Sequence, residues 1–421
     1  MQVRGPRCII IFGTIVLVAC NDVDRALTAP AADLVAVDEE EDEDPGVEFG
    51  PLKGLTAEQL ALFDTGKGVF DRVFVEDDGL GPIFNASACA ECHEDPGSGG
   101  VGDEVETHFS HFDGAICHLL EAKGGNVLQD STTALLYAAT GFTREPEPDP
   151  TTELYELGRR TTPDVLGFGL FDNIPDAAIL ANADPDDRNG DGISGRAHIV
   201  GDRVGKFGRK ASDPDLNGFN AGAFLQEMGI TNPVKSVELN IGGHLIGGAY
   251  IAASVDPRPE SPGVTELTQP ELDALNAFVR FLAPPSTLRL NGRENTGKRL
   301  FKSVGCDGCH IPTMTTGQSP ISALNRKRVH PFSDFLLHDI GTAGASENCV
   351  GAATAQEFRT EPLTGLRFSE DEGVGFLHDG SAPSIEAAIQ RHGAEAANSR
   401  TNFNSLTAEQ KLALLQYLRS I

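Results

Sequence analysis

Two short stretches decide how this chain is organised: Cys89-Ala90-Glu91-Cys92-His93 and Cys306-Asp307-Gly308-Cys309-His310. Both read C-x-x-C-H. This spacing lets two thiols form thioethers with the vinyl groups of haem while the imidazole that follows binds the iron. A zinc site would require further Cys or His pairs at finger-like spacing, and none accompanies either motif. A redox dithiol would not need the His. The sequence therefore predicts two covalently bound haems, with His93 and His310 as proximal ligands.

Capped helices frame the motifs. A capping box, in which an N-cap Thr is followed by Gln or Glu at the third helical position, occurs at Thr56, Thr268 and Thr407. Apolar residues at helical spacing follow each of them. Another helix is expected over 296–304, directly before the second motif. A helix that enters C-x-x-C-H and a capped helix that closes the unit are the plan of a class I cytochrome c domain.

We therefore predict a mainly α fold with two cytochrome c-like domains, 52–285 and 288–421. The first is enlarged by long Gly-, Pro- and Asp-rich loops. Strand signals are weak, although 240–254 could contain a short hairpin.

The N-terminal segment has the pattern of an export signal. Arg4 and Arg7 precede an apolar run, and Leu17-Val18-Ala19-Cys20 resembles a bacterial lipobox. We expect residues 1–19 to be a lipoprotein signal peptide, Cys20 to carry a lipid, and the protein to face the periplasm. An ordinary signal peptide or an uncleaved anchor is the alternative. Seven consecutive acids, 38–44, indicate that 20–51 is a flexible acidic tether or a docking arm.

Charge and the remaining cysteines limit the function further. The 421 residues contain 33 Lys and Arg against 62 Asp and Glu, a net charge of −29, which argues against nucleic-acid binding and favours a basic electron-donor protein as partner.

Of eight cysteines, Cys117 and Cys349 belong neither to a motif nor to the signal. They either form a disulfide or remain two buried thiols.

The rest of the chain resembles the di-haem oxidoreductase family, relatives of the bacterial dihaem cytochrome c peroxidases that are also labelled thiol oxidoreductases. The resemblance covers most of residues 55–421. The matching segments, in chain order, are Gly79–Pro82, Arg159–Pro163, Asn173–Asp176, Ala183–Asp187, Gly195–Arg196, Leu336–Asp339, Phe358–Leu363, Phe376–Ser381 and Ile385–Ala388.

This resemblance implies roles for individual residues. Peroxidases place a distal Met fourteen residues after the His of their F-x-H-D-G motif, and here that position is His392, which would give the His310 haem two imidazole ligands. Glu227-Met228-Gly229 matches the motif whose Glu moves a proton between the oxygens of peroxide. A solvated helix residue is the alternative for Glu227, and a surface His for His392.

Other candidates are less constrained. His108 or His111 fits the displaceable distal ligand of the His93 haem, and Met228 is expected in the core. Relatives carry a Trp between the haems, but this chain has no Trp, and 207–210 occupies that region. Asp187, Asn189 and Asp191 resemble half of a calcium loop, with His198 where a Glu would stand; Asx turns are the alternative.

The prediction is a dihaem oxidoreductase that takes electrons at the His310 haem and reduces peroxide at the His93 haem with the help of Glu227. A pure electron-transfer protein with both irons closed, serving a redox or iron-uptake partner, is the alternative. Thiol oxidation ranks below both, because haem attachment uses all four paired cysteines.

Overall fold

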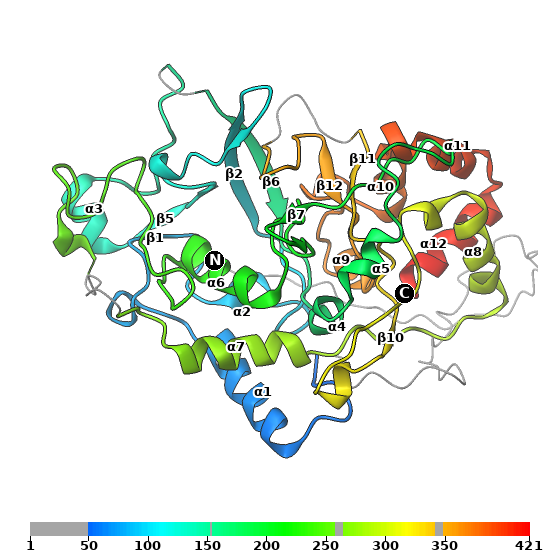
Figure 1. Ribbon diagram of the computed structural model, residues 1–421, viewed down its shortest axis with the longest axis horizontal. Helices are drawn as coiled ribbons and strands as arrows, with labels where there is room; N and C mark the ends of the chain where they lie inside the picture. Colours follow the sequence, from blue (N-terminus) through cyan, green and yellow to red (C-terminus); the bar gives the residue numbers. More distant parts are fainter. Residues whose placement is uncertain (1–48, 152–153, 257–263, 342–347) are drawn as a thin grey trace, which may run out of the picture. The chain divides into compact units, whose positions relative to one another are not determined.

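Two helix pairs repeat one arrangement in the computed structural model, which describes residues 49–151, 154–256, 264–341 and 348–421 (Figure 1). In the first pair α1 (Ala57–Phe70) packs on α7 (Gln269–Phe281), and in the second α8 (Gly292–Ser303) packs on α12 (Ala408–Arg419). In each pair, the first helix precedes a C-x-x-C-H motif.

Both helix pairs cross at a glycine. A Cβ on Gly66 would lie 1.9 Å from the carbonyl oxygen of Ala274, and one on Gly297 would lie 2.1 Å from that of Ala413. Any side chain at either position would force the helices apart, so both crossings depend on glycine.

The expected caps are present. Thr56, Thr268 and Thr407 all form capping boxes. The helix expected over 296–304 begins earlier, at Gly292, because Asn291 provides its N-cap and Glu294 completes the box.

Long loops and further helices, most of them short, fill the rest of the described chain. These helices are α2 (Cys89–Cys92), α3 (Ala134–Thr140), α4 (Phe168–Asp172), α5 (Asp176–Leu180), α6 (Leu216–Met228), α9 (Leu366–Asp371), α10 (Ile385–Arg391) and α11 (Ala397–Ser405). The described residues are mainly α, as predicted. No described helix has both the length and the apolar character needed to cross a membrane.

A four-stranded sheet is the main feature that the sequence did not indicate. Its central strand, β2 (Val105–Phe112), pairs antiparallel with β3 (Cys117–His118), β4 (Val127–Leu128) and β6 (Glu156–Thr161). The other strands form two-stranded pairs: β1 (Ile83–Phe84) with β5 (Ser131–Thr132), β7 (Ile199–Val200) with β8 (Arg203–Val204), β9 (Met314–Thr315) with β10 (Arg328–Val329), and β11 (Leu337–Asp339) with β12 (Glu357–Arg359).

The hairpin predicted within 240–254 was wrong. That segment contains only the isolated bridges Ile241–His244 and Ile246–Ile251. Gly242, Gly243 and Gly247 all have positive φ, which turns the chain too often for a continuous ladder.

Only one of the two larger apolar cores lies within a single predicted domain. One core, which includes Phe301, Phe403 and Tyr417, lies entirely within 288–421. The largest core centres on Phe63 and Phe278 and also takes in Met314 and other residues beyond the turn at 283–286. The described residues all belong to one compact unit. The predicted signal peptide and all but the last residues of the predicted tether lie outside the described residues.

Candidate haem sites

The second C-x-x-C-H motif opens onto a cavity of about 240 Å³. The motif follows α8 through a short 3-10 turn at Cys306–Gly308. Nδ1 of His310 lies 2.9 Å from the carbonyl oxygen of Phe332 and can donate a hydrogen bond to it, and burial lowers the pKa of His310 to about 4. The imidazole is therefore neutral, and its Nε2 lone pair remains available to a metal ion.

His392 lines the same cavity as His310. It follows α10, and its Nδ1 lies 2.8 Å from the carbonyl oxygen of Ala388. Burial lowers the pKa of His392, and the nearby charge of His392 contributes to lowering that of His310. The two imidazoles that the sequence singled out for one iron thus face one cavity, each with Nδ1 held by a backbone carbonyl.

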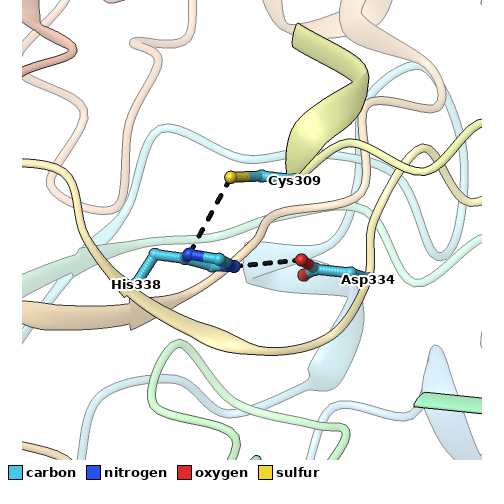
Figure 2. A group of neighbouring side chains, drawn as sticks. All are labelled: Cys309, Asp334 and His338. Atoms are coloured by element: carbon cyan, nitrogen blue, oxygen red, sulfur yellow. Dashed lines mark hydrogen bonds and ion pairs between the residues drawn. The ribbon is translucent and has the colours of Figure 1, made fainter. Parts of the chain in front are cut away.

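A buried His beside the second motif was not given a role by the sequence. Figure 2 shows Cys309, Asp334 and His338 close together. Nε2 of His338 lies 3.0 Å from Asp334, and its Nδ1 lies 2.9 Å from Glu395 and 3.8 Å from Cys309 Sγ. Burial alone would lower the pKa of His338, but the hydrogen bonds to Asp334, Cys309 and Glu395 raise it to about 12. Both ring nitrogens of His338 therefore have a carboxylate partner.

The first motif forms the short helix α2. Nδ1 of His93 lies 2.9 Å from the carbonyl oxygen of Pro163 and 3.3 Å from that of Gly100. Burial lowers the pKa of His93, as it does that of His310. Phe70, at the end of α1, packs near the His93 ring with centroids 6.1 Å apart. Both motifs therefore orient their His in the same way.

Glu227 lies beside this first motif, at the C-terminal end of α6. Asn85 holds it twice: its side-chain amide donates to Glu227 Oε2 at 2.6 Å, and its backbone N–H donates to the Glu227 carbonyl at 2.7 Å. Burial, followed by the charge of Glu106, raises the pKa of Glu227 well above its usual value. Because the charges of Glu104, Glu227 and Glu106 also raise the pKa of the Cys92 thiol, after burial, these carboxylates must lie near that thiol.

The structure separates the two His candidates for the first site. His108 Nε2 lies 2.7 Å from Glu106, the carboxylate next to Glu227. His111 lies 3.5 Å from Glu156 and stacks on His118. Of the two, only His108 is joined to the group around Glu227.

An arginine–glutamate bridge connects the surroundings of the two motifs. Arg209 and Arg359 both contact Glu361 Oε2, at 2.8 and 3.0 Å. Arg209 also donates to the carbonyl oxygen of Thr161, two residues before Pro163. Phe207, in the region where relatives carry Trp, is instead a core residue whose ring lies 5.5 Å from that of Phe168.

The two methionines of the described chain are core residues. Met228 is 2% exposed and Met314 is 7% exposed, and both belong to the largest apolar cluster. Met228 was expected there.

The segment Asp187–Asp191 is organised by its own hydrogen bonds. Asp187 accepts from the backbone N–H of Gly192 at 3.2 Å, and Asn189 and Asp191 each accept from a backbone N–H two residues ahead at 2.9 Å. The bonds of Asn189 and Asp191 are Asx turns. His198 bonds to Lys210 and Ala352. Calcium at this loop stays a prediction.

Cys117 and Cys349 form a disulfide, with Cα atoms 5.8 Å apart. The free thiols of the described residues are the four in the two motifs, Cys89, Cys92, Cys306 and Cys309. Although each motif places two thiols close together, neither pair is joined. With free paired thiols followed at both motifs by a His that a backbone carbonyl orients, and a cavity at the second motif, the donor set fits two c-type haems.

Comparison with solved structures gives three similar chains. Hydrazine synthase of Kuenenia stuttgartiensis is 14% identical with a TM-score of 0.37, covering 97% of this chain and 100% of that chain. A MauG-like protein associated with microbial copper homeostasis is 13% identical with a TM-score of 0.35, covering 90% and 94%. The diheme peroxidase BthA of Burkholderia thailandensis is 16% identical with a TM-score of 0.40, covering 90% and 88%. All three TM-scores are low, so the assignment rests on the sequence family.

A comparison with curated proteins found no match. Residues 151–421 match the family described as "Di-haem oxidoreductase, putative peroxidase". The matched range is more than half of the chain and contains the second motif, Glu227 and His392, while the first motif precedes it. The family identifies haem as the cofactor, and this chain belongs to it: it is a di-haem oxidoreductase.

Proposed function

We propose that the protein is an exported peroxidase with two covalently attached haems in two cytochrome c-like domains. Cys89 and Cys92 would carry one haem, with His93 as its proximal ligand. The second motif would carry the other, and His310 and His392 would bind its iron. The four free thiols and the two oriented imidazoles support this assignment.

The observation that carries the proposal is the difference between the two sites. The cavity at His310 presents a second imidazole, which suits an iron that only transfers electrons. The neighbourhood of His93 presents a carboxyl whose pKa is raised by burial, which suits proton transfer to a bound substrate. Electrons would therefore enter at the His310 haem, and peroxide would be reduced at the His93 haem.

Glu227 would move the proton. Breaking the O–O bond of peroxide unevenly requires a base for one oxygen and an acid for the other, and a carboxyl whose pKa is raised by burial is suited to exchange a proton in both directions. Asn85 fixes the position of Glu227 through its side chain and its backbone. When bound, haem would supply the electrons and the coordination position for peroxide.

Localisation and partner belong to the same proposal. A lipid on Cys20 would anchor the protein on the periplasmic side of a bacterial membrane, and the acidic surface would attract a small basic electron-donor protein. The lipobox-like stretch and the net charge support these two points. Calcium at Asp187–Asp191 is not needed for this function.

The test is the variant Glu227→Gln in the full chain loaded with both haems. We expect peroxide turnover to fall by about 100-fold or more, with the visible spectra of both haems unchanged, because the amide cannot carry the proton. Glu156→Gln, on β6, is the matched control and should keep wild-type turnover. Unchanged turnover in Glu227→Gln would remove Glu227 from the mechanism. If the wild-type protein stays six-coordinate at both irons after one-electron reduction and does not reduce peroxide, it is an electron-transfer protein instead.

A further inference from the structure

The segment from Phe332 to Ile340 contacts the chain at both imidazoles of the second site. At its start, the carbonyl oxygen of Phe332 lies 2.9 Å from Nδ1 of His310. At its end, the carbonyl oxygen of Ile340 accepts a hydrogen bond at 2.6 Å from the backbone N–H of Gly393, the residue after His392. One stretch of chain, which includes β11, thus lies against both candidate iron ligands.

The Glu395 carboxylate adds a second attachment to the same segment. It lies three residues after His392, and its side chain is only 15% exposed. Its Oε2 lies 2.9 Å from Nδ1 of His338 and accepts from the backbone N–H of Ser194 at 2.8 Å. Its Oε1 accepts from the backbone N–H of Asp339 at 3.0 Å. Both oxygens are therefore used, and three partners from two distant segments hold one carboxylate.

The strand that receives Glu395 is itself well supported. β11 pairs with β12 along its length and forms an isolated bridge with Arg196 at its other edge. Below it, the Asp334 carboxylate lies 3.0 Å from Nε2 of His338 (Figure 2), and the Asp334 backbone N–H donates to the Cys309 carbonyl at 3.0 Å. A side chain held by such a supported element is placed more precisely than one held by a loop.

The other side-chain attachments near His392 lie at the surface. The His392 ring is fixed to its own helix through the Ala388 carbonyl, so its place in the cavity depends on where the end of α10 is held. Gln390 donates to Asn404 at 2.7 Å, but this bond is exposed and competes with water. The shielded bonds of Glu395 therefore carry more of the attachment.

We propose that Glu395, through His338 and β11, is the positioning residue that holds His392 on the iron of the second haem. This inference rests on the proposed function, because it requires His392 to be an iron ligand. Glu395 does not touch the haem and takes no part in the reaction. Without it, the chain after α10 separates from β11, and the His392 imidazole leaves the iron more often.

The experiment uses the full chain loaded with both haems and measures how fast added cyanide replaces His392 at the ferric second haem. Glu395→Gln should raise this rate by about 10- to 100-fold, because a partner that orients a metal-bound His is lost. The matched control is Glu386→Gln, the same change at an exposed position of α10, which should keep the wild-type rate. A wild-type rate in Glu395→Gln would overturn the proposal.

A milder variant tests the same attachment if Glu395→Gln does not fold, as judged by circular dichroism. Gly341 follows Ile340 with a φ of 64°, and a Cβ there would lie 3.0 Å from the backbone nitrogen of Ala394. Gly341→Ala should therefore push the segment after His392 away from β11 and raise the cyanide rate, by less than Glu395→Gln does. A wild-type rate in a folded Gly341→Ala variant would also overturn the proposal.

The variant His392→Gly separates failure of this inference from failure of the proposed function. If its second-haem spectrum changes while Glu395→Gln keeps the wild-type spectrum and cyanide rate, His392 is a ligand and Glu395 does not position it. If the second-haem spectrum is unaltered in His392→Gly, the ligand assignment and the positioning role are both wrong. Because neither readout uses peroxide, a wild type that is inactive toward peroxide would refute the peroxidase function and leave the positioning role to these measurements.

Discussion

Replacing Cys117 and Cys349 together by Ser should destabilise the protein strongly. Their disulfide joins residues 232 positions apart in the chain. For a closed loop of that length, the chain-entropy relation gives a loss of about 18 cal/mol/K in the unfolded state, or about 5 kcal/mol of stability at 25 °C. Glu227 and the second motif lie inside this loop, and the loop spans more than half of the chain, so the cross-link restricts a large part of the unfolded chain.

The local surroundings of the disulfide add a separate, smaller contribution. Ser110, which is fully buried on β2, accepts a hydrogen bond from the Cys349 backbone N–H at 2.8 Å. Ser110→Ala leaves the disulfide intact but removes the partner of a buried N–H, which should cost about 1–3 kcal/mol. This variant measures how much the free energy of unfolding falls when a hydrogen bond beside the disulfide is lost but the disulfide remains.

The assay is guanidinium unfolding of the full chain with both haems, followed by far-ultraviolet circular dichroism and by the haem absorbance. The double Ser variant should lose clearly more free energy of unfolding than Ser110→Ala. A loss below about 1 kcal/mol in the double variant would refute the reasoning, because the cross-link would then not restrict the unfolded chain as the loop length requires.

Two further predictions concern single side chains. His392→Gly should remove one of the two imidazole ligands of the second haem. The spectrum of this haem should then no longer be six-coordinate low spin, while the spectrum of the first haem stays unchanged. An unaltered second-haem spectrum would exclude His392 as a ligand. Burial raises the pKa of Glu145 from 4.5 to about 8. The folded chain therefore retains a proton that the unfolded chain has released, and stability should fall as pH rises from 4.5 to 8. Glu145→Gln should flatten this fall in pH-dependent unfolding, and an equally steep fall in the variant would show that Glu145 is not its source.

The motifs could be predicted because their chemistry is local. Thioether attachment and proximal ligation need two thiols and an imidazole within five consecutive residues, so the spacing alone carries the information. Helix caps are equally local, and all three predicted capping boxes are present. The pairing of Cys117 with Cys349 was left open, because two cysteines so far apart carry no sequence signal of contact.

The strands of the sheet were missed for a different reason. β2 has the β-branched and aromatic residues of a strand, Val105, Thr107 and Phe109, but polar residues alternate with them in a loop-rich region. β6 contains two arginines and a glycine and carries little apolar signal. Pairing with a neighbour, rather than propensity, makes these segments strands.

The sequence by itself predicted haem as the cofactor, three of the four helix starts that frame the motifs, and the family. Only the tertiary structure decided what surrounds each His. Glu106 and Glu227 come from a strand and a helix far apart in the chain, and His392 reaches the His310 cavity from the end of α10. Ligation and proton transfer at these positions depend on distances of a few ångströms between distant segments, and those distances are set by packing.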